Sequence, residues 1–79
     1  MHYLYILINL DTKLPYIGQT SDLKRRLSEH QQSKNVKLVY YESYLSALDA
    51  RKRERVLKNY GTTWTRLKER LSTSFKMAG

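Results

Sequence analysis

The first apolar segment of the chain has the composition of a strand. Residues 2–9 are rich in aromatic and β-branched side chains, which favour strands. Because successive side chains of a strand point to opposite faces, one face carries Tyr3, Tyr5 and Leu7. The other face carries Leu4, Ile6 and Ile8. The pattern therefore predicts a strand over residues 2–9.

A turn and a second strand follow. Asp11-Thr12-Lys13 has the polar composition of a turn. Pro15 cannot donate to a strand ladder, so the next strand, at about residues 14–18, is expected to be short or at a sheet edge. The small separation between the two strands predicts an antiparallel hairpin.

The next segment changes to a helical period. Thr20-Ser21-Asp22 is typical of a helix start, and Asp22 adds favourable negative charge near the N-terminus. Leu23 and Leu27 lie one turn apart on the same stripe and are expected to face the sheet. The helix is predicted to end near Gln32.

The second half of the chain predicts one more strand and two more helices. Residues 36–44 read as a strand, and a capping-box pattern then opens a helix over about residues 46–59. Gly61 is expected to end that helix. A third helix over about residues 62–71 follows from apolar residues at helical spacing, and residues 72–79 are expected to fray.

This order, β-β-α-β-α-α, predicts a small α/β protein of the α+β type. The simplest layered arrangement is a three-stranded antiparallel sheet flanked by three helices. The 79 residues suffice for a single domain, expected to span residues 1–79 with its core at about 2–71.

The net charge of the chain gives information about its binding partner rather than about its fold. Fifteen Lys and Arg against seven Asp and Glu leave a formal charge of +8, which favours a polyanionic partner such as nucleic acid. A basic surface without such a partner is the alternative. No segment approaches the roughly 18 apolar residues of a membrane span, and no signal peptide is visible. The absence of cysteine suits the cytoplasm, which is the expected location.

Glu54 stands out on the second helix because it interrupts a small, apolar stripe. Burying a carboxylate is costly unless a base, hydrogen-bond donors or a metal accompany it. The alternatives are an i,i+4 pair with Lys58 or an exposed boundary position. The stripe consists of Ala47, Ala50, Glu54 and Leu57, and the surrounding basic residues are Arg51, Lys52, Arg53, Arg55 and Lys58.

The first helix and the hairpin carry further polar side chains. Lys24-Arg25-Arg26 is a basic cluster near the helix start, where backbone N–H groups also favour anions. Arg26 and His30 are i,i+4 neighbours and project side by side. Tyr5 and Tyr16 become cross-strand neighbours if the hairpin register allows it.

As an ordered set, these motifs resemble the GIY-YIG nuclease superfamily, and within it the small, stand-alone, excision-nuclease-like proteins. The resemblance covers about residues 2–71. It implies a metal-dependent endonuclease that hydrolyses phosphodiester bonds in DNA, with a role in DNA repair. It rests on Tyr3-Leu4-Tyr5, Tyr16-Ile17-Gly18, the segment from Asp22 to His30, Val39-Tyr40-Tyr41-Glu42, and the segment from Ala50 to Lys58 around Arg53-Glu54.

The resemblance also implies roles for individual residues. Tyr16 would accept a proton from the attacking water, with Tyr5 supporting it and His30 as the alternative base or a relay. Arg26 would contact the scissile phosphate, and Glu54 would be the single carboxylate ligand of a divalent metal. A metal with one carboxylate and several waters suits Mg²⁺, or Mn²⁺ in its place.

Two departures from the family pattern accompany the match. Tyr3 replaces the leading glycine of the first motif, a change that the small-protein branch commonly shows. Gln19 stands where lysine or threonine is often found, so it can donate a hydrogen bond but supplies no positive charge.

The expected partner is DNA rather than RNA, engaged by a monomer or a weak homodimer without a membrane. The competing hypothesis is a nucleic-acid-binding module with little or no catalysis, and a third is an interaction protein with an incidental basic surface. The residues expected to contact nucleic acid are Lys24, Arg25, Arg26, Arg51, Arg53 and Lys58.

Overall fold

An antiparallel sheet with β1 at its centre divides the protein into two layers. The computed structural model describes residues 1–78, and the strand order is β2-β1-β3. This confirms the predicted fold class. The described elements are β1 (His2–Asn9), β2 (Pro15–Thr20), α1 (Leu23–Ser33), β3 (Val36–Tyr44), α2 (Ala47–Asn59), α3 (Gly61–Arg70) and α4 (Ser72–Ala78).

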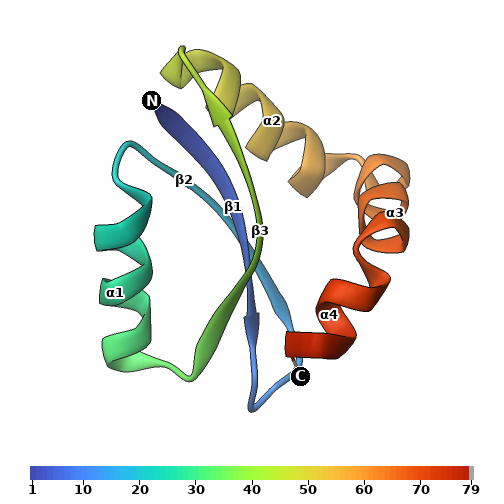
Figure 1. Cartoon of the computed structure of the whole chain (residues 1–79). Coiled ribbons are helices and arrows are strands. Elements are labelled where there is room, and N and C mark those ends of the chain that lie inside the picture. The colour runs from blue at the N-terminus through green and yellow to red at the C-terminus, as the bar shows by residue number, and fades with distance from the viewer. Residues whose placement is uncertain (79) are drawn as a thin grey trace.

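Each face of β1 contributes to a different core. Figure 1 shows α1 on one side of the sheet and α2, α3 and α4 on the other. Tyr5 and Leu7 pack with the apolar stripe of α1, whereas Leu4 and Ile6 pack with α2 and α3. Because both faces are covered, the middle of β1 is fully buried. The division of Leu4 and Ile6 from Tyr5 and Leu7, which the alternation predicted, is therefore confirmed.

The hairpin between β1 and β2 is organised by one side chain. Asn9 Oδ1 accepts hydrogen bonds from the backbone N–H groups of Asp11 and Thr12, at 2.9 and 3.1 Å. Lys13 adopts a left-handed conformation with φ of 63°. Pro15 then begins β2 at the sheet edge, where its missing N–H costs no ladder bond. The second strand extends two residues further than predicted, to Thr20.

A bulge between β1 and β3 divides the apolar run of β3 between the two layers. The pairing changes register between Ile6 and Leu7, so Leu7 lies opposite Leu38 and Ile6 lies opposite Tyr40. Without the extra residue, Leu38 and Tyr40 would share one face. With it, Leu38 packs on the α1 side and Tyr40 on the side of the other helices.

The C-terminal region differs from the prediction. Residues 72–79 were expected to fray, yet Ser72–Ala78 forms α4, and Gly79 lies outside the described residues. Phe75 contacts the core and meets the Trp64 ring edge-on at 6.5 Å. The interaction that organises the segment is tertiary, which is why the local sequence gave no helical signal.

The α2–α3 junction also differs. Gly61 was expected to end α2, but the helix ends one residue before Tyr60, and no described glycine has the positive φ of a glycine cap. Tyr60 instead interrupts the helix in an extended conformation and serves both as C-cap of α2 and as N-cap of α3. Gly61 is simply the first residue of α3. Among residues 1–78, the helices are too short or too polar to cross a membrane.

A charged and hydroxyl-rich cluster fastens α2 to β3. Arg53 donates two-pronged hydrogen bonds to Glu42, with Nε to Oε1 at 3.1 Å and Nη2 to Oε2 at 3.2 Å. The phenols of Tyr40 and Tyr44 donate to the same carboxylate, at 2.6 and 2.5 Å. Glu42 is 17% exposed and Arg53 is 28% exposed, so the pair is screened from solvent. We call these four residues the Glu42 cluster.

The cluster makes stability depend on pH. Burial alone would raise the pKa of Glu42, but hydrogen bonds from Tyr40, Tyr44 and Arg53 outweigh it and lower that pKa. A depressed pKa in the folded state stabilises the protein above the unfolded value of about 4.3, and the stabilisation is lost as pH falls through the folded value.

Replacing Glu42 with glutamine should therefore destabilise the protein by about 1–3 kcal/mol at pH 7, because Arg53 keeps a half-buried charge without its counterion. Urea unfolding of both proteins between pH 7 and pH 3 measures the difference, which should shrink below about pH 4. Glu29→Gln, which breaks an exposed pair with Arg25, is the control and should cost less than about 0.5 kcal/mol. An equal, pH-independent loss in both variants would contradict this account of the cluster.

Candidate active site

The two tyrosines of the paired motifs meet on the α1 side of the sheet because of the hairpin register. Tyr5 lies opposite Gly18, and Tyr16 lies opposite Leu7, two residues further along. Tyr5 and Tyr16 are thus diagonal neighbours on one face, with ring centroids 6.2 Å apart. The register that the sequence left open is therefore the one that brings the two rings together.

A glycine is needed at position 18 because a larger side chain would not fit there, not because of its backbone conformation. A Cβ placed on Gly18 would lie 2.6 Å from Cζ and Oη of Tyr5, and 3.0 Å from a ring carbon of Tyr16. Both distances are shorter than a comfortable carbon contact. The glycine of Tyr16-Ile17-Gly18 thus makes room for the Tyr5 ring to lie across β2.

Helix α1 brings a histidine to the same place. Asp22 caps the helix by accepting a hydrogen bond from the backbone N–H of Arg25 at 3.1 Å. Leu23 and Leu27 pack against the Tyr5 side of the sheet, and His30 continues their stripe one turn later. The apolar stripe therefore sets the depth and rotation of α1, and these direct the imidazole at the tyrosines.

His30 contacts both phenol rings. Its Nε2 lies 3.0 Å from the Tyr5 hydroxyl, within hydrogen-bond distance. Its ring centroid lies 5.0 Å from that of Tyr16 and 5.9 Å from that of Tyr5. The three side chains come from β1, β2 and α1, so the arrangement exists only in the folded protein. We call Tyr5, Tyr16 and His30 the central triad.

Protonation within the central triad follows from burial. Burial raises the pKa of Tyr5 to about 12, and the neighbouring Tyr16 adds to the effect. Tyr5 thus keeps its proton at neutral pH and is a poor base. Burial also lowers the pKa of His30, and the positive charges of Arg26 and Lys34 lower it further. His30 is therefore neutral at pH 7 and has a lone pair for a proton or a hydrogen bond.

Arg26 and Glu54 approach the central triad from opposite layers. The Arg26 charge lowers the pKa of Tyr5, and the Glu54 charge raises it, so both groups lie within electrostatic range of the same phenol. Arg26 is exposed on α1, and Glu54 is on α2 across the sheet. The other four residues singled out in the sequence therefore all interact with the Tyr5 phenol, by ring contact, hydrogen bond or charge.

Glu54 occupies a boundary position rather than a buried one. Its side chain is 23% exposed, and Lys58 Nζ lies 3.3 Å from Oε2. The neighbours on its stripe, Ala50 and Leu57, are fully buried as expected. The structure therefore shows Glu54 at a boundary position and in the i,i+4 pair with Lys58 that was considered for it.

Among the five candidate site residues, Glu54 is the only carboxylate. No group of three or more potential ligands among histidine, cysteine, aspartate and glutamate occurs within residues 1–78. A zinc-type cage is therefore not available in the described part of the chain. A lone carboxylate does fit Mg²⁺ or Mn²⁺ if water and phosphate oxygens complete the coordination.

The basic residues fall into different environments. Lys24, Arg26 and Arg51 are exposed on α1 and α2. Arg25 pairs with Glu29 at 3.8 Å, still on the surface. Arg53 was expected to contact phosphate. Its guanidinium instead binds the Glu42 carboxylate in the half-buried Glu42 cluster.

Two features were not found from the sequence. Tyr40, Glu42 and Tyr44 alternate at strand period, which would have placed all three on one face and pointed to the Glu42 cluster. Lys34 gave no such signal, because its proximity to His30 arises at the end of α1, where the chain turns toward β3. Gln19, which departs from the family pattern, forms a side-chain hydrogen bond with His2 through its amide oxygen.

Replacing Gly18 with alanine should displace Tyr5 and Tyr16 and so disrupt the central triad, because the new methyl group occupies the space of the Tyr5 ring. We expect a loss of about 1–3 kcal/mol in the free energy of unfolding, as for overpacked sites. Gly61→Ala is the matched control, since nothing lies within 4 Å of its added Cβ. Thermal unfolding measures both variants, and equal melting temperatures would contradict the close approach.

Comparison with protein families agrees with this geometry. The family model of the GIY-YIG catalytic domain matches residues 1–66 of the 79-residue chain. Comparisons with curated proteins and with solved structures find no match. The matched region stops within α3 and contains all five candidate site residues, Tyr5, Tyr16, Arg26, His30 and Glu54. The chain therefore belongs to the GIY-YIG family, whose catalytic domain is a nuclease domain that acts on DNA.

Proposed function

We propose that the protein is a metal-dependent endonuclease that hydrolyses DNA phosphodiester bonds at the site around β2. The observation that carries the proposal is the contrast within the central triad. Tyr16 is 45% exposed, whereas Tyr5 beside it is 2% exposed. A substrate can therefore reach one phenol, and the other serves as a fixed support behind it.

Tyr16 is the proposed proton acceptor for the attacking water. A free phenol has a pKa of about 10, so the role requires activation by nearby positive charge. Arg26 supplies such a charge in the vicinity of the triad. Hydrolysis then adds the oxygen of water to phosphorus, breaks one P–O ester bond, and leaves a phosphate monoester and a hydroxyl group that takes up a proton.

His30 is the alternative base or a relay for the same proton. Its lowered pKa keeps the imidazole neutral at pH 7, and its ring lies 5.0 Å from that of Tyr16. The contact with the Tyr5 hydroxyl holds the imidazole in place. Tyr5 is therefore a positioning residue for both His30 and Tyr16.

Arg26 is proposed to bind the scissile phosphate. A guanidinium offers two parallel N–H donors that match two phosphate oxygens. Its exposed position on α1 leaves it accessible to a DNA strand lying along β2. The same helix carries Lys24 and Arg25 on its solvent side for neighbouring phosphates.

Glu54 is the residue proposed to hold a divalent cation. When bound, Mg²⁺ or Mn²⁺ would supply Lewis-acid polarisation of the phosphoryl group and stabilise the leaving oxygen. The Lys58 ammonium pairs with the Glu54 carboxylate. A cation bound to Glu54 would compete with this pair, so Lys58 would have to move aside. Because Lys58 is on the exposed end of its helix, this movement costs little.

The Lys58 contact also supports a second candidate function. If Lys58 neutralises Glu54 permanently, the protein is a DNA-binding module with little catalysis. Binding would then persist without metal and fall steeply with salt, because basic residues would make the phosphate contacts.

The Glu54→Gln variant distinguishes the two functions. We expect at least about a hundredfold loss of Mg²⁺- or Mn²⁺-dependent cleavage of single-stranded and branched DNA, because charge stabilisation of the transition state is lost. Glu69→Gln, an exposed change on α3, is the matched control and should cleave normally. Cleavage assays with parallel binding measurements test this.

Two outcomes would count against the endonuclease proposal. Equal cleavage by Glu54→Gln and the wild type would remove Glu54 from the reaction. Salt-sensitive binding without metal-dependent cleavage of any DNA form would favour the binding module instead.

A further inference from the structure

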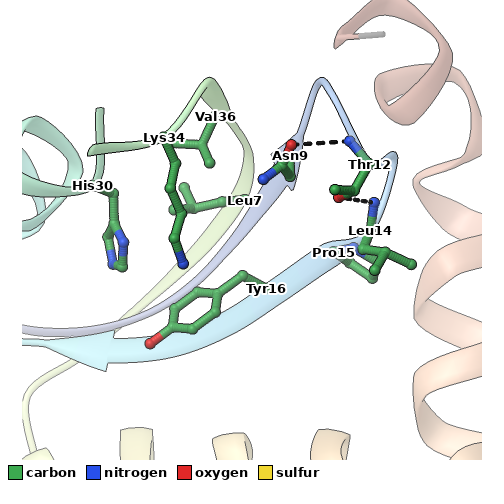
Figure 2. A pocket seen from close by; sticks show the side chains of 9 residues that line it. All are labelled: Leu7, Asn9, Thr12, Leu14, Pro15, Tyr16, His30, Lys34 and Val36. Atoms are coloured by element: carbon green, nitrogen blue, oxygen red, sulfur yellow. Dashed lines mark hydrogen bonds between the residues drawn. The ribbon is translucent and has the colours of Figure 1, made fainter. Parts of the chain in front are cut away.

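A pocket of about 210 Å³ lies next to the central triad, between the β1–β2 hairpin and the end of α1. Figure 2 shows that Tyr16 and His30 line it, so it opens directly into the candidate active site. Leu7 and Val36 form a buried apolar floor, and the hairpin supplies Leu14 on the outer side. None of the roles assigned above uses this space.

The polar groups of the pocket lie on its rim. Figure 2 shows Lys34 extending from the end of α1 toward Tyr16, beside His30. The Lys34 charge contributes to the lowered pKa of His30, which agrees with this proximity. Asn9 gives its side-chain oxygen to the hairpin turn, and Figure 2 shows its amide nitrogen turned the other way, toward the pocket. The pocket thus combines an apolar floor with donors and a positive charge at its mouth.

The size restricts the occupant. Pockets for drug-sized ligands measure roughly 300–1,000 Å³, so this one takes a single ring system rather than a whole nucleotide. A flat ring over Leu7 and Val36 would place its edge near the Asn9 amide and its attached sugar–phosphate near Lys34. Nucleobases have this combination of an apolar face, an acceptor-bearing edge and an anionic attachment.

We infer that this pocket takes one nucleobase of the nucleotide next to the scissile phosphate, with Lys34 at that nucleotide's own phosphate. The inference rests on the proposed function, because it assumes that the DNA strand passes Tyr16 and Arg26. The pocket is continuous with the candidate active site, because Tyr16 and His30 belong both to its lining and to the central triad. This continuity supports the inference.

The occupant determines the substrate class. A base cannot remain paired and stacked in a duplex while it sits in a pocket, so it must be unpaired or turned out of the helix. Turning out a paired base costs a few kcal/mol, and an unpaired base avoids most of that cost. The pocket therefore predicts preference for a strand with at least one unpaired nucleotide at the cleavage position.

Methyl NMR on the wild-type protein tests the inference without catalysis. The protein is titrated, in EDTA, with a single-stranded thymidine tetranucleotide and with an abasic sugar–phosphate chain of the same length and charge. We expect the methyl signals of Leu7, Leu14 and Val36 to shift with the tetranucleotide only. Affinity for the abasic chain should be about tenfold lower, as expected when a base loses its contact surface.

A pair of leucine variants localises the effect. Leu14→Glu places a carboxylate at the pocket mouth, whereas Leu48→Glu makes the same change on α2. Leu14 is 65% exposed and Leu48 is 53% exposed, so neither change disturbs the core. Leu14→Glu should lose the tenfold distinction between the two chains, and Leu48→Glu should keep it.

The outcomes separate this inference from the endonuclease proposal. Equal pocket shifts with both chains, no pocket shifts with either, or unchanged discrimination by Leu14→Glu would each overturn the base pocket, even if the protein cleaves DNA. Pocket shifts that require the bases would support it, even if the protein proves unable to cleave.

Discussion

The close approach of Tyr5 to Gly18 is the constraint on which the candidate site depends. The Tyr5 ring occupies the volume that any side chain at position 18 would fill. This contact lets a buried phenol reach across β2, where it meets His30 from α1 and lies diagonal to Tyr16. It also explains the sequence of the second motif, in which a tyrosine and a glycine on one face are separated by a core isoleucine.

The site is assembled from two layers that are held to the sheet in different ways. On one side, the leucines of α1 set the position of His30 by apolar packing. On the other, the Glu42 cluster fixes α2 against β3 through Arg53, the residue directly before Glu54. The half-buried ion pair is therefore proposed to position the metal-binding carboxylate indirectly, by fixing its helix. The flanking pocket lies on the α1 side, next to Tyr16.

The sequence predicted most of the fold because its signals were local. Alternation in β1, Pro15 at the start of β2 and the caps at Asp22 and Ser46 each act over a few residues. The parts that it missed depend on tertiary contacts. Helix α4 forms where Phe75 packs on Trp64, and the proximity of Lys34 to the triad needs the register of three separate elements. The five site residues were singled out from helix and strand patterns and received their roles from the family resemblance, whereas the pocket beside them required the structure.

We propose that a divalent metal at Glu54 and a DNA phosphate at Arg26 come together beside Tyr16. The most direct test is a crystal structure of the Tyr16→Phe variant with Mn²⁺ and a single-stranded DNA oligonucleotide, because Mn²⁺ can be located by its anomalous scattering. We expect one Mn²⁺ bound to Glu54, Lys58 displaced from that carboxylate, and a DNA phosphate beside Arg26. A metal bound elsewhere, or DNA lying away from β2 with the Glu54–Lys58 pair intact, would contradict it.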